Sequence, residues 1–321
     1  MVLVTGGAGF IGSAYIKYLN TLGIYDIIVC DKFGTDMKWR NLRNVQFKNM
    51  IAPEEIFSFL KNFSASIDTI VHMGACSSTT EEDMDYLYAN NVMFSQELWN
   101  YAQKKKSKFI YASSAATYGD GSLGYDDKLP CEDLSPLNKY GYSKQLFDLW
   151  VMRQPQVKTP WAGLKFFNVF GPNEYHKGSM ASVVFHAYNQ IVKCKKIRLF
   201  KSYRTEIPHG MQKRDFIYIK DAVQMIDFFR ISKFTNGLYN IASGAANSFY
   251  DLALHTFEAM QIKPRISFID MPVSLRDKYQ YYTLGRVNKL QEQGYQKKMF
   301  SFHDAVLDYT AEYLNRNYKC L

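Results

Sequence analysis

Residues 4–12 read Val4-Thr5-Gly6-Gly7-Ala8-Gly9-Phe10-Ile11-Gly12, and this stretch decides the fold. It continues the apolar run that begins at Val2 and precedes a helical pattern over residues 13–22. Gly7, Gly9 and Gly12 satisfy the GxGxxG spacing. Glycines at these points permit a tight turn and let the backbone approach a pyrophosphate, while the next helix offers its N-terminal N–H groups. The strand–turn–helix context therefore predicts a dinucleotide-binding turn.

Further apolar runs alternate with amphipathic stretches through the first half of the chain. The runs that predict buried strands are 2–4, 27–30, 67–73, 109–112, 161–167 and 237–242. Parallel neighbours need crossover connections, and right-handed crossovers give a doubly wound sheet. We predict a Rossmann-type α/β fold. Residues 1–165 form its nucleotide-binding domain, residues 214–242 return to it, and residues 166–321 form mainly a smaller α/β substrate-binding domain.

Composition excludes several classes of protein. The chain has 321 residues, of which 47% are hydrophobic and 21% charged, as in ordinary globular proteins. No apolar run approaches the ~18–20 residues that span a bilayer, and the first residues lack the basic and apolar regions of a signal peptide. The five cysteines are scattered without CxxC spacing, which predicts free thiols in a reducing, cytoplasmic compartment and no metal site.

The net charge of +9 has two interpretations. One is a basic surface for nucleic acid or membrane, and the other is a set of cations for a small anionic ligand. The only dense basic run, residues 104–108, lies between a helical pattern and a strand, where a solvated turn is expected. We therefore predict no nucleic-acid partner and no membrane contact.

An acidic residue is expected about 20 positions after the glycine turn, at the end of the second strand. Asp31 stands 19 residues after Gly12, directly after the run 27–30. A carboxylate there binds a ribose 2′-hydroxyl and favours NAD. Lys32, Lys38 and Arg40 follow closely, however, and cations around a 2′-phosphate would accommodate NADP. These residues leave NAD and NADP both open.

A Tyr–Lys pair and a serine predict proton-transfer chemistry. Tyr140 and Lys144 lie one helical turn apart, and a nearby ammonium favours the phenolate of a tyrosine whose usual pKa is ~10. Ser114 ends a buried strand, the place where ligands sit in open α/β sheets. Asn91 is the polar member of a helical stripe over residues 87–101. Its amide makes either a structural bond to nearby backbone or a bond that braces the active-site helix or cofactor.

These motifs together resemble the extended short-chain dehydrogenase/reductase superfamily. The TGGAGFIG opening, the SSAATYG strand end and the YGYSK pair are all present. The resemblance implies a catalytic trio of Ser114, Tyr140 and Lys144, in which the tyrosine moves a proton while a hydride passes to or from a nicotinamide. Dehydratases of this superfamily carry an Asp-Glu pair after the serine or threonine. Ala115 and Ala116 stand there in this chain, so dehydration is not expected.

Two further strings narrow the resemblance. HMGACSSTT at residues 72–80 and FNVFGP at 167–172, continuing as HKGSMAS at 176–182, are similar to the ADP-glyceromanno-heptose 6-epimerase family of lipopolysaccharide inner-core precursor synthesis. That family implies tightly bound NADP and a transient ketone at C-6″ of the ADP-heptose, with the hydride returned to the opposite face. It also implies two acid/base groups, matched by Tyr140 and Lys177, and a homo-oligomer, typically a pentamer.

The same resemblance assigns binding residues. Those implied for the cofactor are Gly6, Gly9, Phe10, Ile11, Gly12, Asp31, Lys32, Lys38, Met73, Gly74, Ala75, Cys76, Ser77, Asn91, Lys144 and His176. Those implied for the substrate are Asn168, Ser179, His186, Phe200, Arg214 and Tyr279. A guanidinium such as that of Arg214 suits a pyrophosphate, whereas His186 has an equal alternative as a core histidine.

The chain departs from the family at Lys201-Ser202-Tyr203 and in a longer loop over residues 203–212. Two other functions stay open. One is an extended short-chain epimerase or reductase acting on a UDP- or GDP-sugar, and the other is a non-catalytic binding protein on the same fold.

Overall fold

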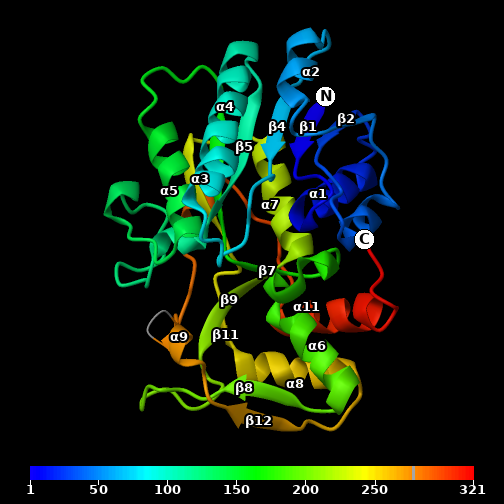
Figure 1. The fold of residues 1–321 in the computed structure, drawn as a ribbon, viewed down its shortest axis with the longest axis vertical. Helices are drawn as coiled ribbons and strands as arrows, with labels where there is room; N and C mark the ends of the chain where they lie inside the picture. The colour runs from blue at the N-terminus through cyan, green and yellow to red at the C-terminus, as the bar shows by residue number, and fades with distance from the viewer. Residues whose placement is uncertain (277–278) are drawn as a thin grey trace.

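The central feature of the computed structural model, which describes residues 1–276 and 279–321, is a seven-stranded parallel sheet (Figure 1). Its strand order is β10-β6-β5-β4-β1-β2-β3. The strands are β1 (Val2–Thr5), β2 (Ile27–Cys30), β3 (Asn49–Ile51), β4 (Thr69–His72), β5 (Lys108–Ser114), β6 (Trp161–Phe166) and β10 (Gly237–Ile241). Six of the seven coincide with the predicted apolar runs, and the predicted Rossmann-type fold is confirmed. The short edge strand β3 is missed because its residues are exposed or only half-buried and form no apolar run.

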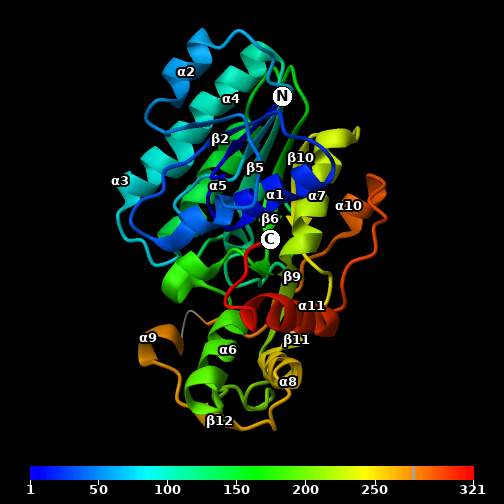
Figure 2. The ribbon, with the colours of Figure 1, turned by 90° about the vertical axis from the view of Figure 1, so that its right-hand side faces the viewer.

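Helices cover both faces of this sheet (Figure 2). One layer contains α1 (Phe10–Thr21) and α7 (Ile219–Ile231), and the other contains α2 (Ile56–Asn62), α4 (Phe94–Lys105) and α5 (Lys139–Met152). Successive strand residues point to opposite faces. Val4, Val29 and Val71 accordingly pack with the first layer, while Leu3, Ile28 and Ile70 pack with the second. Burial on both faces explains the uninterrupted apolar runs in the sequence.

The predicted helical stripe over residues 87–101 is interrupted by a π-helical turn. The segment runs as α3 (Met84–Leu87), the π turn Tyr88–Met93 and then α4. Asn91 lies inside the π turn, where its carbonyl accepts a hydrogen bond from Ser95 Oγ at 2.8 Å. Such single turns are frequent at functional sites.

The second half of the chain adds smaller sheets below the central one (Figure 1). A three-stranded sheet contains β7 (Asn168–Phe170), β9 (Lys213–Tyr218) and β11 (Ala246–Ser248), and a parallel pair contains β8 (Ile197–Phe200) and β12 (Ile266–Ile269). The helices there are α6 (Val183–Cys194), α8 (Phe249–Ala259), α9 (Val273–Arg276) and α11 (Phe302–Tyr309), whereas α10 (Asn288–Glu292) packs beside β10. β10 returns to the edge of the large sheet. The domain boundary near residue 165 stays a prediction.

Short helical turns complete the described residues. They are the 3₁₀ turns Met37–Leu42, Ala115–Tyr118, Cys131–Asp133 and Tyr175–Met180, and a second π turn at Thr310–Leu314. Among the residues described, no helix combines the length and apolarity that crossing a bilayer requires.

Candidate active site

The glycine turn joins β1 to α1 and is packed backbone against backbone. Gly6 has φ +65°, and a Cβ on it would lie 2.6 Å from the backbone nitrogen of Gly74. A Cβ on Gly12 would lie 2.1 Å from the carbonyl oxygen of Gly6. Gly9 caps α1 without a side-chain hydrogen bond, so the first-turn N–H groups have no side-chain acceptor from the cap. A cradle that only glycine fits, at a helix N-terminus, suits the pyrophosphate of a dinucleotide.

Asp31 connects this turn to a lysine. Its Oδ2 accepts a hydrogen bond from the backbone N–H of Ala8 at 2.8 Å, and its Oδ1 lies 2.9 Å from Lys38 Nζ. Lys32 instead pairs with Glu54 at 3.0 Å on the exposed surface. Of Lys32 and Lys38, both predicted to contact the cofactor, only Lys38 therefore lies at the carboxylate.

Asn91 makes both kinds of bond that the sequence left open, to nearby backbone and to the active-site helix. Its Oδ1 accepts from the backbone N–H of Cys76 at 2.9 Å, and its Nδ2 donates to the Cys76 carbonyl at 3.0 Å. The same amide donates to Ser143 Oγ at 2.9 Å. Ser143 lies between Tyr140 and Lys144 on α5, so Asn91 fixes the loop after β4 against the helix that carries both residues.

Tyr140 is buried at the start of α5. Asn138 caps this helix by accepting from Gly141 N at 2.8 Å. Burial raises the pKa of Tyr140 above its usual value, and the side-chain hydrogen bond with Ser114 opposes that rise. Ser114 Oγ also accepts from Ala116 N at 3.1 Å. The structure thus brings Ser114 and Tyr140 together, with the tyrosine held as a protonated phenol.

Lys144 does not act on Tyr140 as the sequence predicts. Its Nζ donates to the Ala112 carbonyl at 2.9 Å, and burial lowers its own pKa to about 8 against the opposing charge of Asp148. The predicted lowering of the Tyr140 pKa is wrong for this structure, because desolvation of the phenol outweighs the other influences on it. The Lys144 ammonium therefore binds a carbonyl near the end of β5 and not the Tyr140 hydroxyl.

A buried carboxylate beneath the site was missed by sequence reasoning. Asp148 is fully buried and accepts hydrogen bonds from Tyr111 OH at 2.9 Å and from Ser113 Oγ at 2.6 Å. Lys165 Nζ lies 3.9 Å away. Asp148 stands four residues after Lys144, so an acid on the buried face of the same helix was the available signal.

Lys177 approaches from the 3₁₀ turn Tyr175–Met180. Its Nζ lies 5.4 Å from the ring centre of Phe10, at the start of α1. Burial lowers the pKa of Lys177, opposed by the charge of Glu174. Thr79, in the loop after β4, also reaches this turn, with its Oγ1 3.8 Å from Met180 Sδ. The structure therefore places Lys177 against the glycine turn, with a lowered pKa of the kind a base requires.

Two asparagines that carry no sequence motif join the glycine turn to the segment that carries His176 and Lys177. Asn41 donates to the carbonyls of Ala8 and Asn173, both at 3.0 Å, and its Nδ2 lies 3.4 Å from His176 Nδ1. Asn173 donates to Ser13 Oγ at 3.0 Å. Beside them lies a cavity of about 200 Å³, lined by Met37, Arg40, Asn41, Tyr175, His176, Phe185 and Tyr318. These bonds fix the glycine turn to the segment that carries both predicted residues.

Arg214, Phe200 and Tyr279 form a second group of predicted residues. Arg214 on β9 is 9% exposed, with its guanidinium 5.1 Å from the ring centre of Tyr279 and 5.5 Å from that of Phe249. It donates to the Lys213 carbonyl at 2.9 Å, and no carboxylate within residues 1–276 or 279–321 pairs with it. Burial lowers its pKa. Phe200 meets Tyr279 edge-on at 6.5 Å between ring centres.

The remaining substrate candidates lie around these two groups. Asn168 donates to the carbonyl of Asp215, next to Arg214, at 3.1 Å. His186 is half-buried, and its Nε2 lies 3.3 Å from the carbonyl of Ser179. Ser179 belongs to the same 3₁₀ turn as Lys177. This pair therefore lies beside Lys177, and the alternative of a core histidine does not describe His186.

The divergent loop packs on the segment that carries Tyr279. Tyr203 N donates to Tyr281 OH at 3.2 Å, and the Arg204 guanidinium lies 4.5 Å from the Tyr281 ring centre. From the same segment, Gln280 donates to the carbonyl of Gly119, in the strand end beyond Ser114. The segment thus links the Arg214 group to the Ser114 end of the site.

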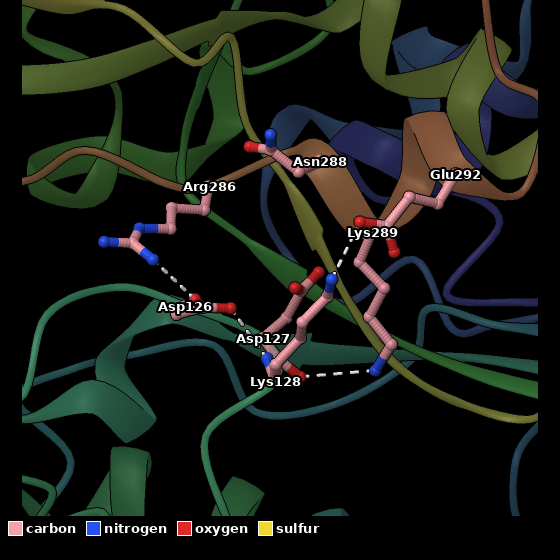
Figure 3. Close-up of a pocket in the computed structure, with 7 residues that line it drawn as sticks. All are labelled: Asp126, Asp127, Lys128, Arg286, Asn288, Lys289 and Glu292. Atoms are coloured by element: carbon pink, nitrogen blue, oxygen red, sulfur yellow. Dashed lines mark hydrogen bonds and ion pairs between the residues drawn. The ribbon is translucent and has the colours of Figure 1, made fainter.

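A second cavity lies away from these residues (Figure 3). It measures about 310 Å³ and is lined by Asp126, Asp127, Lys128, Arg286, Asn288, Lys289 and Glu292, none of them a predicted site residue. Arg286 pairs with Asp126 and Lys128 with Glu292, both at 2.8 Å. Its charges largely compensate one another, so we do not assign the nucleotide to it.

Comparisons with known proteins agree with the resemblance seen in the sequence. The model of the NAD dependent epimerase/dehydratase family matches residues 2–242. A Fusobacterium nucleatum protein named ADP-L-glycero-D-manno-heptose-6-epimerase is 46% identical, and one of the same name from Nitratidesulfovibrio vulgaris is 45% identical, each over 98% of both chains. The crystal structure of Helicobacter pylori ADP-L-glycero-D-manno-heptose-6-epimerase has a TM-score of 0.82 at 26% identity, covering 97% of this chain and 95% of that one.

Proposed function

Because this chain belongs to the NAD dependent epimerase/dehydratase family, and within it to the ADP-L-glycero-D-manno-heptose-6-epimerases, we propose that it interconverts the D-glycero and L-glycero epimers of ADP-β-D-manno-heptose at C-6″. The observation that carries the proposal is the pair Tyr140 and Lys177. Tyr140 is buried and Lys177 is half-buried, and they come from α5 and from the turn before α6. Epimerisation through a ketone needs a proton donor and a proton acceptor on either face of one carbon, which two such groups supply.

The cofactor we propose is NADP, held by the glycine turn, Lys38 and His176. Its nicotinamide would supply the hydride acceptor and the hydride donor within one turnover, so no external nicotinamide is consumed. Lys38 balances the charge of Asp31 at 2.9 Å, which removes much of the repulsion that a 2′-phosphate would otherwise meet. Gly74, which packs on Gly6, keeps the loop after β4 close to the turn.

Proton transfer is assigned to two groups, one that donates a proton and one that accepts a proton. Burial holds Tyr140 as a phenol, so it donates a proton to the oxygen at C-6″. Burial also weakens the ammonium of Lys177, so this residue accepts the hydroxyl proton. Ser114 donates a hydrogen bond to the reacting oxygen. Lys144, on α5, is assigned to cofactor binding. Starting from the other epimer, the two groups exchange roles.

Substrate binding is assigned to the Arg214 group. The buried guanidinium is suited to the pyrophosphate of ADP, with Phe200 and Tyr279 around it. Fixing the ADP there would leave the heptose free to turn, so that either face of the ketone meets the hydride. We assign Asn168, Ser179 and His186 to the sugar hydroxyls. Ala115 and Ala116 carry no acid that could drive loss of water instead.

The proposed setting is cytoplasmic synthesis of heptose precursors for lipopolysaccharide, by a homo-oligomer. All five cysteines are free thiols, which agrees with a reducing compartment.

The decisive experiment is proton NMR of ADP-D-glycero-β-D-manno-heptose incubated in D₂O with pure protein and no added nicotinamide. We expect conversion to the L-glycero epimer without solvent deuterium at C-6″. The control replaces ADP by UDP on the sugar, which should not bind. Absence of conversion by protein that carries bound cofactor would overturn the heptose assignment. Deuterium at C-6″ would instead exclude direct hydride return.

A further inference from the structure

We propose a binding site for a divalent transition-metal ion, formed by His255, Glu258 and His303 outside the active site. His255 and Glu258 lie one turn apart on α8, and His303 lies on α11. One ligand atom from each residue can be chosen so that all three lie within 4.8 Å of one another. His303 Nε2 lies 3.1 Å from both carboxylate oxygens of Glu258, and His255 Nδ1 lies 4.0 Å from Glu258 Oε2.

These separations suit a metal after small side-chain movements. Bonds of about 2.1 Å in a tetrahedral zinc site place ligand atoms about 3.4 Å apart. The three side chains are 24%, 57% and 40% exposed, so they have room to rotate inward by the remaining distance. The exposed side of the cluster leaves the fourth coordination position open to water.

A carboxylate behind His303 supports the assignment. Histidines that bind metals usually donate their second ring N–H to a carboxylate, which fixes the tautomer and raises the basicity of the ligating nitrogen. His303 Nδ1 lies 3.3 Å from Asp304 Oδ1, and Asp304 is itself held by Ser301 Oγ at 2.7 Å. The His255 ring packs edge-on against His303 at 4.8 Å and against Phe302 at 5.8 Å. Both rings are thus oriented before any ion arrives.

The donor set indicates the class of metal. Two imidazoles and one carboxylate suit Zn²⁺, Ni²⁺ or Cu²⁺, whereas Mg²⁺ and Ca²⁺ prefer oxygen ligands alone. No spacing pattern in the sequence points to this site, because His303 lies 45 residues after Glu258. The scattered cysteines predicted no metal site, and the proposed site of two histidines and a glutamate departs from that prediction.

An ion at this place would join α8 to α11 in the substrate-binding half. Phe302, next to His303, stacks on Phe216 with ring centres 5.1 Å apart, and Phe216 lies two residues after Arg214 on β9. The role we assign is a clamp that stiffens the support of this strand. It makes no contact with the proposed reacting atoms and stands independently of the proposed heptose substrate.

The test is isothermal titration of tag-free protein with ZnCl₂. We expect one saturable site per chain, with affinity at least tenfold lower in His303→Gln and in His255→Gln. Asp304→Asn should weaken binding about tenfold through loss of the supporting carboxylate. His209→Gln removes an exposed histidine elsewhere and serves as the matched control, with unchanged affinity. MgCl₂ should give no saturable heat.

Two results would overturn the proposal. One is the absence of saturable zinc binding up to 0.2 mM, which would leave the His303–Glu258 contact as an ordinary ion pair. The other is zinc binding that survives the double change His255→Gln with His303→Gln, which would place the ion elsewhere. Co²⁺ absorption in the visible range gives a second readout, and its intensity should fall in the same variants.

Discussion

Replacing Arg214 by methionine should weaken nucleotide binding without destabilising the fold. Arg214 is 9% exposed, and within residues 1–276 and 279–321 its guanidinium has no carboxylate partner. A buried charge of this kind costs several kcal/mol of desolvation, which the rings of Tyr279 and Phe249 and one carbonyl only partly offset. Methionine keeps a long apolar stem in the same space and removes that cost.

The expected magnitudes separate binding from stability. Truncating one partner of a buried charge pair costs about 2–5 kcal/mol of binding, which corresponds to roughly a 30-fold to several-thousand-fold weaker complex. Replacing an unpaired buried cation by an apolar residue should leave the free energy of unfolding unchanged or raise it by about 1 kcal/mol. Isothermal titration with ADP measures the first quantity, and urea unfolding measures the second.

A matched control is Lys213→Met, which removes the same charge from an exposed neighbour on the same strand. It should change ADP affinity less than about threefold, as expected of a solvent-screened cation. The reasoning fails if Arg214→Met binds ADP within twofold of the unaltered protein. It fails equally if the variant loses more than about 2 kcal/mol of stability, because Arg214 would then be a structural residue.

Four further predictions concern the dinucleotide side and the proton-transfer groups. Tyr140→Phe and Lys177→Met should each lower kcat by about 10²- to 10⁴-fold in the NMR assay while the cofactor stays bound, and equal loss of cofactor would show a binding role instead. Gly12→Ala should abolish cofactor retention on gel filtration, because its Cβ would lie 2.1 Å from a backbone oxygen, whereas Gly9→Ala, with its nearest such contact at 3.1 Å, should retain more. Burial lowers the pKa of Lys144 to about 8, so the unfolded chain binds more protons above that pH and stability gains as pH rises, by at most about 1.4 kcal/mol per pH unit. Urea unfolding at pH 7.5 and 9.5 should show that gain reduced in Lys144→Met, and an equal gain in both proteins would contradict it.

The nucleotide-binding half is predictable from the sequence because its signals are local. Six strands of the large sheet are buried on both faces and read as apolar runs, and the glycine turn follows the first of them within a few residues. The steric reason for Gly6 and Gly12 is also local in part, since Gly12 meets Gly6 itself. Strand β3 was not predicted because an edge strand buries fewer of its side chains and needs no continuous apolar run.

The substrate side is assembled from distant segments and leaves weaker traces. Arg214 is surrounded by rings from Phe249 and Tyr279, which lie 35 and 65 residues further along the chain. No spacing rule connects such positions, and only the family resemblance proposed them. Asn41 and Asn173 were also not predictable from spacing, because each makes hydrogen bonds to residues more than 30 positions away.

The raised pKa of Tyr140 fits a mechanism that needs both a proton donor and a proton acceptor. A lysine beside the tyrosine would have favoured a phenolate, and with Lys177 as a second base the site would then hold two acceptors and no donor. Burial instead raises the pKa of Tyr140 and lowers that of Lys177. The two shifts move the groups toward one neutral phenol and one neutral amine. These directions favour one proton donor and one proton acceptor, the pair that oxidation to the ketone and its reduction from the opposite face require.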